Sequence, residues 1–327
     1  MLSACMVAVG IAAGGAAGVG SFNVILSYIA TGCAFTLLAA LAFAFFEFTK
    51  LARVRADKPV AVVLGLVRQR AALIVLPTLL WPLMLAAYTT AKMAIPFLVG
   101  YSWDGFWADA DRLIFGRDAW MLSIPLVEWA PVRLWEWVYS GVWGVLLFIW
   151  FAAVPFFASK RRVGVMYTAS FAAWIIGGWL VAYATSAAGP VFAHLVDPTM
   201  ADRFLPMREH LAAALTPDGP IHRTQVALAT VLEKHVAVPA AGISAMPSMH
   251  IAMTTIYVLA ARRTWWIVPA CTFWLIIFIG SAYFGYHYWI DGIVAAVIAV
   301  LCWKAAELAL APGDLPLPAT LQRSGAP

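Results

Sequence analysis

Residues 1–46 read MLSACMVAVGIAAGGAAGVGSFNVILSYIATGCAFTLLAALAFAFF, and they contain no Lys, Arg, Asp or Glu. A transmembrane helix needs about 20 predominantly apolar residues, so this stretch has room for two of them. We expect spans near 2–20 and 23–48, joined by a turn at residues 20–23. For residues 2–20, a signal peptide and a re-entrant segment stay open as alternatives, although the basic residues that begin a signal peptide are missing.

The composition of the whole chain also indicates a membrane protein. Apolar residues make up 64% of the 327 residues and charged residues 11%, against roughly 45–50% and 25% in soluble domains. A soluble surface needs far more charge, and disordered, collagen-like and disulfide-rich proteins have other compositions. The four cysteines lie within apolar stretches and form no Cys-x-x-Cys pair, so we interpret them as packing residues.

Further apolar stretches follow the first two, and most are long enough to cross a bilayer. They lie near 71–93, 136–158, 163–185, 247–261, 265–284 and 288–310. We therefore predict an all-α polytopic membrane bundle. Its six core helices occupy residues 71–310, behind an N-terminal helix or hairpin in residues 1–48. The proline-containing tail, residues 311–327, is expected to be unstructured.

Basic residues predict the orientation of the bundle. They cluster in three short connections, at residues 50–70, 160–162 and 262–263, which share one side of the membrane if the helices alternate. The positive-inside rule places that side in the cytoplasm. The longer loops 94–135 and 186–246 then face outward, which is the periplasm for a bacterial inner membrane. In the first of these loops, Tyr101–Phe115 interleaves aromatic and acidic residues, as an interfacial helix or lid does.

The first candidate site is the string GISAMPSMH at residues 242–250, which leads into an apolar stretch. Pro247 suits the first turn of a helix, where its missing N–H costs nothing. Ser248 and the unpaired backbone N–H groups of a helix start can bind an anion. A helix start that carries Ser248 and His250 at a membrane boundary therefore predicts a phosphate cradle.

The second candidate site is the string GSAYFGYHYWIDG at residues 280–292. His287 and Asp291 are four residues apart, so on a helix they share one face. A carboxylate beside an imidazole fixes its tautomer and raises its basicity. An aspartate so close to a membrane span is by itself a candidate functional residue. Two predicted spans that cross the membrane in opposite directions separate His250 from His287. We therefore expect the two histidines to lie at the same membrane face.

The segments PSMH (247–250) and GYHYWID (285–291) resemble the second and third signature motifs of the type 2 phosphatidic acid phosphatase superfamily. The longer strings are most similar to its inositol phosphorylceramide synthase-like branch. Other elements of that branch have counterparts in Lys92-Met-Ala-Ile-Pro96, in the stretch with Asp104, Asp111, Arg112 and Gly116, and in Ala188-Gly189-Pro190. The resemblance covers roughly residues 70–310.

The resemblance implies a lipid phosphatase or phosphotransferase that works through a phosphohistidine and needs no metal or other cofactor. By this analogy His287 attacks phosphorus, Asp291 orients His287, and His250 protonates the leaving oxygen and then activates water or an alcohol acceptor. A neutral imidazole is a good nucleophile near pH 7, and phosphoryl transfer needs mainly positioning and positive charge. The expected partners are a lipid phosphate, an alcohol acceptor where transfer replaces hydrolysis, and the bilayer, not nucleic acid.

The chain departs from the superfamily pattern where two arginines are expected. The third motif has Ser281-Ala282 in place of Ser-Arg, and no Arg-Pro follows Lys92 at the expected spacing. We therefore expect the phosphate to be held by Lys92, Ser248, Ser281 and Arg112. Lys92 is favoured because it lies at the outer end of a predicted span, with simple snorkelling to the interface as the alternative.

Other interpretations of His250, His287 and Asp291 stay open. These residues could form a buried polar network between helices, or hold zinc with one open position. They could also act as a proton relay in a transporter or flippase of amphiphilic phosphates. A serine protease built on Ser248 lacks the usual G-x-S-x-G or Ser-Lys arrangement. The sequence leaves open the identity of the lipid and the choice between hydrolysis and transfer.

Overall fold

The computed structural model describes residues 22–234 and 242–310, and every regular element within these ranges is a helix. The expected span at 2–20 and the tail at 311–327 lie outside the described residues. Among the described helices, five are long and apolar enough to cross a membrane. The all-α polytopic membrane bundle predicted from the sequence is therefore confirmed.

The long helices follow the predicted spans with small shifts at their ends. They are α2 (Phe22–Arg53), α4 (Ala71–Leu98), the continuous rod Val132–Phe157 and the rod Lys160–Ala184, and α16 (Trp289–Ala309). The first rod consists of α7 (Val132–Glu136), a π-helical turn η1 (Trp137–Val142) and α8 (Trp143–Phe157). The second consists of α9 (Lys160–Ile175), a π-helical turn η2 (Ile176–Val181) and α10 (Ala182–Ala184).

Two shorter apolar helices, α14 (Met249–Ala261) and α15 (Ile267–Tyr283), form an antiparallel pair within the bundle. Helix α14 packs against α15 and α16, and α16 packs in turn against α9. Gly177 and Gly178 in η2 allow a close approach, because a Cβ on Gly178 would lie 2.8 Å from the Tyr88 ring. The buried core therefore surrounds α14, the helix that carries His250.

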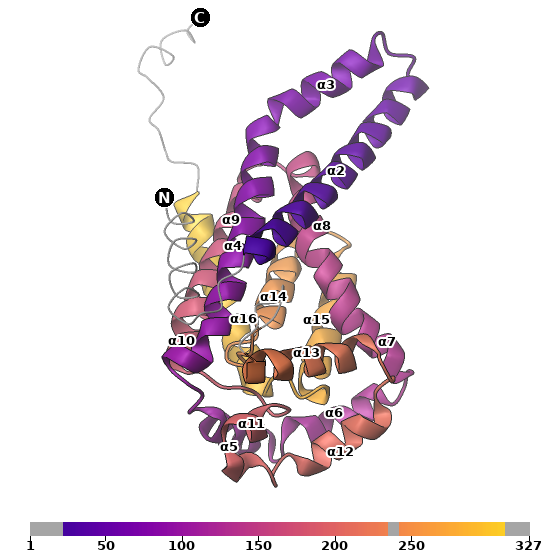
Figure 1. Cartoon of the computed structure of the whole chain (residues 1–327). Coiled ribbons are helices and arrows are strands. Elements are labelled where there is room, and N and C mark those ends of the chain that lie inside the picture. Colours follow the sequence, from indigo (N-terminus) through magenta and orange to yellow (C-terminus); the bar gives the residue numbers. More distant parts are fainter. Residues whose placement is uncertain (1–21, 235–241, 311–327) are drawn as a thin grey trace, which may run out of the picture.

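Helices α2 and α3 (Pro59–Gln69) form an arm that projects beyond the rest of the bundle (Figure 1). At 1.5 Å per residue, the 32 residues of α2 extend about 48 Å, which exceeds the roughly 30 Å hydrocarbon core of a bilayer. The basic connection expected as a short loop thus contains a helix, α3. Helix α3 has 11 residues, too few to span a membrane, so a search for long apolar stretches does not detect it.

The basic connections meet at one end of the bundle, as the alternation of spans predicts. Arg70 donates hydrogen bonds to the carbonyls of Pro155 and Ala158, at 2.8 and 3.0 Å. Arg162 donates to the carbonyl of Ala260 at 2.6 Å. Cations near the last carbonyls of a helix offset the negative end of its dipole. These side chains therefore stabilise the helix ends at the face predicted to be cytoplasmic.

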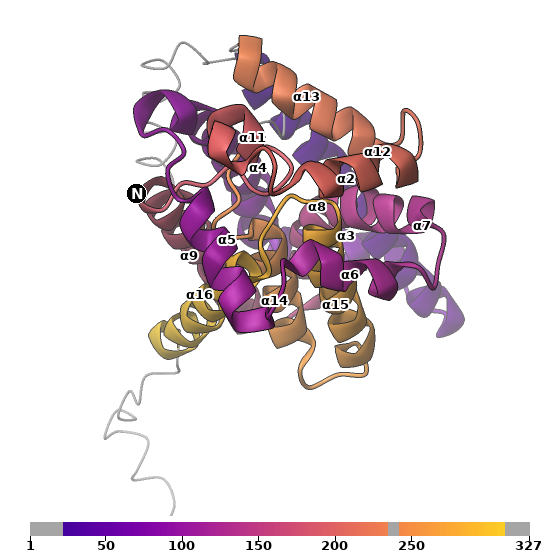
Figure 2. The same ribbon diagram turned by 90° about the horizontal axis from the view of Figure 1, so that it is seen from below.

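Short helices gather at the opposite end of the bundle and form what we call the cap (Figures 1 and 2). They are α5 (Asp104–Phe115), α6 (Ala119–Val127), α11 (Ala193–Val196), η3 (Pro198–Met200), α12 (Leu205–Ala214) and α13 (Pro220–Lys234). The segment expected to be an interfacial helix is α5. It buries Asp104 and Asp111 on one face and exposes Phe106 and Leu113 on the other.

Candidate active site

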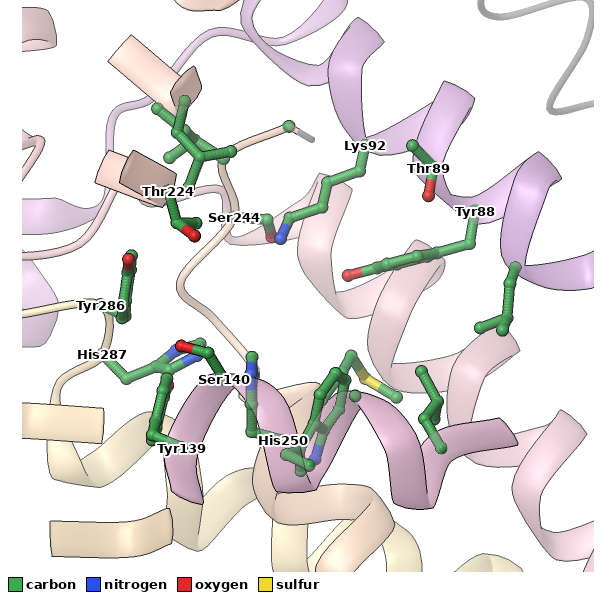
Figure 3. Close-up of a pocket in the computed structure, with 18 of the residues that line it drawn as sticks. Tyr88, Thr89, Lys92, Tyr139, Ser140, Thr224, Ser244, His250, Tyr286 and His287 are labelled. Atoms are coloured by element: carbon green, nitrogen blue, oxygen red, sulfur yellow. The ribbon is translucent and has the colours of Figure 1, made fainter. Parts of the chain in front are cut away.

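A cavity of about 280 Å³ lies where α14 begins, between the long helices and the cap. His250, His287 and Lys92 line this cavity, which we call the site cavity. Figure 3 shows Lys92 and Tyr88 across it from the two histidines. Its other polar lining residues include Tyr28, Thr89, Tyr139, Ser140, Thr224, Ser244 and Tyr286. Three predicted site residues from three separate parts of the chain are thus brought together.

The rings of His250 and His287 are close neighbours in the site cavity. Their centroids are 5.9 Å apart and their planes are inclined at 64°. The His250 ring stacks on Trp143 at 3.9 Å and lies parallel to Tyr139 at 4.8 Å. Because α14 and α15 run antiparallel, the start of α14 and the turn after α15 lie at the same level.

His287 is buried and has a defined tautomer. Its Nδ1 atom lies 2.7 Å from the carbonyl oxygen of Ala245. A carbonyl only accepts hydrogen bonds, so Nδ1 carries the proton and Nε2 keeps a free lone pair. Burial, together with the charge of Lys92, lowers the pKa of His287 from 6.5 to about 3, and the hydrogen bond to Ala245 opposes this shift. The imidazole is therefore neutral at pH 7, which is the nucleophilic form.

Asp291 supports His287 in a way that differs from the predicted helical pair. Helix α16 begins only at Trp289, so His287 lies in the preceding turn and the shared helical face is wrong. The carboxylate of Asp291 instead turns back and accepts the N–H of Tyr288 at 2.9 Å. Its Oδ2 lies 3.5 Å from Nδ1 of His287, within ion-pair range if the ring becomes charged. Asp291 thus caps α16 and faces the imidazole at the same time.

Lys92 is the one member of the expected phosphate-binding set that lines the site cavity. Its Nζ lies 5.9 Å from the centre of the Tyr88 ring. No ion pair joins it to an acidic side chain within residues 22–234 and 242–310. Helix α4 continues to Leu98, so Lys92 lies inside a helix and not at the outer end of a span. Its ammonium group is available for an anionic ligand.

The other three expected phosphate ligands lie outside the lining of the site cavity. Ser248 is fully buried at the N-cap of α14, and its Oγ has no hydrogen-bond partner in the described part of the chain. Ser281 donates to the carbonyl of Phe278 at 2.7 Å. Arg112 forms an ion pair with Asp118 at 2.7 Å. Pro247 precedes Ser248, so it lies before the helix and not in its first turn.

Several residues of the site cavity were missed by reasoning from the sequence. Tyr139 and Ser140 belong to the π-helical turn η1, and Trp143 follows it. Such turns often occur at functional sites, because one extra residue changes which side chains face a cavity. A π-helical turn inside an almost uniformly apolar stretch leaves no periodic signal. The aromatic cluster between Trp135 and Trp143 was the only visible cue in that part of the sequence.

The site cavity has both polar and apolar lining residues. The polar ones include the histidines, Lys92 and Ser244, and the apolar lining consists mainly of Leu85, Leu147, Trp174, Leu228 and Met249. Across the described residues, no group of three or more His, Cys, Asp or Glu side chains is arranged to hold a metal ion. The arrangement therefore suits an amphiphile with an anionic group, approached by two imidazoles and one ammonium.

These features define a helical membrane protein with a two-histidine site where its long helices meet the cap. The family model of the PAP2 superfamily matches residues 106–305, and the chain belongs to this type 2 phosphatidic acid phosphatase superfamily. Membership supports a membrane phosphatase or phosphotransferase that acts on lipids. The match includes His250, His287 and Asp291 but excludes Lys92. Comparison with curated proteins and with solved structures gives no match.

Proposed function

We propose that the protein is an integral membrane lipid-phosphate phosphatase or phosphotransferase that carries the phosphoryl group on His287. The observation that supports this most strongly is the site cavity itself. It places the free Nε2 of a neutral His287, the ring of His250 and the ammonium group of Lys92 around one small volume. These are a nucleophile, a proton donor and a counter-charge for phosphoryl transfer.

In the first proposed step, the Nε2 lone pair of His287 forms a bond to phosphorus. The bond between phosphorus and the lipid oxygen breaks, and protonated His250 gives its proton to that oxygen. The positive charge that develops on the His287 ring is stabilised by the carboxylate of Asp291, 3.5 Å from Nδ1. Once an anionic phosphate lies beside it, the faces of Trp143 and Tyr139 would add cation–π attraction to a protonated His250 ring.

In the second proposed step, neutral His250 takes a proton from water or an alcohol. The oxygen of that molecule bonds to phosphorus, the bond from phosphorus to Nε2 breaks, and His287 returns to its neutral form. The products are inorganic phosphate after hydrolysis or a new phosphate ester after transfer. The longer sequence strings favour the inositol phosphorylceramide synthase-like branch, so an alcohol acceptor belongs in any test.

The phosphate is proposed to lie between Lys92 and the start of α14. Backbone N–H groups in the first turn of a helix have no partners within the helix, and they attract anions. Met249 and His250 supply that first turn where it borders the site cavity. Lys92 then takes over the role of the arginines that the superfamily motifs place here. Ser248, Ser281 and Arg112 serve the surrounding structure.

The membrane face is proposed from the distribution of charge. The site cavity borders the start of α14 and the cap helix α13, whereas Arg70, Arg162 and Arg262 lie at the start of α4, the start of α9 and the end of α14, at the opposite end of the bundle. Since basic connections favour the cytoplasmic side, the site would face outward, which is the periplasm in a bacterial inner membrane. The apolar lining residues of the cavity would accommodate the start of a lipid chain, with the phosphate at headgroup depth.

The test uses purified protein in lipid vesicles. Phosphatidate, a polyprenyl diphosphate, a sphingolipid phosphate and a phosphoinositide are supplied with and without an alcohol acceptor, and products are identified by mass. We expect cleavage of at least one phosphate bond, abolished in His287→Ala and unaffected by chelator. Loss of activity in chelator would indicate a zinc site. Movement of the lipid between leaflets without bond cleavage would contradict the proposal and indicate a transporter.

A further inference from the structure

The acidic stretch in α5 was noted in the sequence, and the proposed reaction gives it no role. Asp104, at the start of α5, is 3% exposed. Its Oδ2 accepts the N–H of Ala188 at 2.7 Å, and its Oδ1 accepts the N–H of Gly189 at 2.8 Å. Oδ1 also accepts the hydroxyl proton of Tyr288 at 3.0 Å. One carboxylate thus satisfies three donors from two distant parts of the chain.

Both parts of the chain held by Asp104 lead directly to His287. Tyr288 is its neighbour in sequence. On the other side, Ala187 accepts the N–H of Ala245 at 2.8 Å, and the carbonyl of Ala245 accepts Nδ1–H of His287 at 2.7 Å. Asp104 is therefore connected to His287 in two ways. One path runs by hydrogen bonds through the turn at 187–189 and Ala245 to Nδ1 of the imidazole, and the other runs through Tyr288 and the backbone.

A second carboxylate reinforces the same contact between the cap and the bundle. Asp111, two turns further along α5, accepts the N–H of Ile290 at 3.0 Å and that of Ala119 at 3.3 Å. Ile290 lies in the first turn of α16, just after His287. Helix α5 is therefore attached to the His287 segment at two points, and Asp104 is the one that reaches the partner of Nδ1.

We infer that Asp104 is a positioning residue for His287. It fixes the turn at 187–189 and the hydroxyl of Tyr288, and through them the Ala245 carbonyl that keeps the proton on Nδ1 and the lone pair on Nε2. This inference rests on the proposed function for the meaning of the tautomer, but the tautomer itself is a property of the resting protein. A displacement of about 1 Å in a reacting group can cost 100-fold in rate, so a distant carboxylate can control turnover.

The test is the ¹⁵N spectrum of protein labelled at histidine, in detergent, with His287 assigned by its loss in His287→Gln. In the wild type, Nδ1 should be protonated and Nε2 bare. In Asp104→Asn, which keeps the shape but can accept only part of the three bonds, we expect a mixture of tautomers. Tyr288→Phe removes only the hydrogen bond from Tyr288 to Asp104 and should show a smaller shift in the His287 tautomer. If Asp104→Asn does not fold, the spectrum of Tyr288→Phe tests the inference.

The matched control is Asp109→Asn, on the same helix. Asp109 is exposed and pairs with Arg203, so its loss changes the charge of α5 by the same amount. Its spectrum should equal the wild type. Where a substrate is turned over, kcat should fall about 10- to 100-fold in Asp104→Asn with KM changed by less than about 3-fold. A merely structural role would lower the amount of active protein and leave the tautomer intact.

A wild-type His287 spectrum in both Asp104→Asn and Tyr288→Phe would overturn the inference, whatever the activity. A changed tautomer in Asp104→Asn with an unchanged Asp109→Asn would support it. If the wild type cleaves no lipid phosphate, the proposed function fails, but the spectra still decide whether Asp104 positions the ring.

Discussion

The rings of His250 and His287 lie 5.9 Å apart at an angle of 64°, with His250 in the first turn of α14 and His287 in the turn before α16. Both rings line the site cavity, so a phosphoryl group bound there can approach both of them. One ring can then contact phosphorus while the other contacts a phosphorus-bound oxygen, which is the geometry that in-line transfer needs. The roles proposed for the two rings rest on their surroundings, since His287 has a bare Nε2 and His250 stacks with Tyr139 and Trp143.

The acid role of His250 predicts a dependence on the leaving group. In His250→Ala, alkyl phosphates should lose about 10²- to 10⁴-fold in kcat/KM, the usual contribution of a general acid. An aryl phosphate such as p-nitrophenyl phosphate leaves without protonation and should lose far less. The measurement is kcat/KM across phosphates of increasing leaving-group pKa. An equal loss over the whole series would argue against proton donation by His250.

The counter-charge role of Lys92 predicts weaker binding of a transition-state mimic. Orthovanadate should compete with substrate in the wild type, and Lys92→Met should raise its inhibition constant about 10- to 100-fold, the value of a hydrogen bond to a charged group. Lys304→Met is the matched control, because Lys304 is exposed near the far end of α16. Equal affinity in both variants would remove Lys92 from the site.

The turn at Gly189 predicts a sharp contrast between two glycine substitutions. Gly189 has a φ of +88°, and an added Cβ would lie 2.5 Å from the carbonyl oxygen of Tyr286. Gly189→Ala should therefore lower stability by about 2–4 kcal/mol, combining backbone strain with overpacking. Gly105→Ala, in open space within helix α5, should be neutral or raise stability by about 0.5–1 kcal/mol. Thermal unfolding in detergent gives both values.

Equal changes in stability for Gly189→Ala and Gly105→Ala would contradict the geometry of this turn. Because Gly189 contacts the carbonyl next to His287, the alanine there should also lower turnover, whereas Gly105→Ala should leave it unchanged.

Asp111 predicts a pH dependence of stability. Burial raises its pKa from 3.8 to about 6, opposed by hydrogen bonds from Ile290 and Ala119. The folded protein therefore holds this proton more tightly than the unfolded chain does. Its stabilising contribution is complete below pH 3.8 and is lost as the pH rises through 6. Asp111→Asn cannot titrate, so the stability gap between wild type and variant should narrow from pH 4 to pH 7.

Melting temperatures of the two proteins are measured side by side across this pH range. Titrating groups that do not interact with Asp111 cancel in the difference, so what remains reports on Asp111 and on its charged neighbours Asp118 and Asp291. A gap that is constant or that widens with pH would show that Asp111 is not buried as the structure has it.

Much of the bundle could be predicted from the sequence, because apolar length is a direct signal of a membrane span. The positions of α4, α14, α15 and α16 follow the expected stretches within a few residues. The antiparallel course of α14 and α15 also predicted that His250 and His287 could meet. Helix α3 and the π-helical turn η1 were missed, since neither changes the apolar character of its stretch.

The partners of charged side chains were the least predictable part of the site. Arg112 appeared suited to hold a phosphate, but its neighbour in space is Asp118. Asp104 is bonded to Ala188, Gly189 and Tyr288, which lie far from it along the chain. Such pairings depend on how the cap folds over the bundle, and the spacing of residues within one motif contains no information about them.

The central claim is that His287 carries the phosphoryl group, and trapping that intermediate tests it most directly. The protein is mixed rapidly with a lipid phosphate labelled with ³²P, quenched under alkaline conditions that preserve phosphohistidine, and mapped by mass spectrometry. We predict label on the peptide with His287 in the wild type and none in His287→Ala. In His250→Ala we predict more label than in the wild type when a ³²P-labelled aryl phosphate replaces the lipid, because its leaving group needs no protonation and only breakdown is slowed. Substrate cleavage with no protein-bound label in either the wild type or His250→Ala, or label that persists in His287→Ala, would contradict the account.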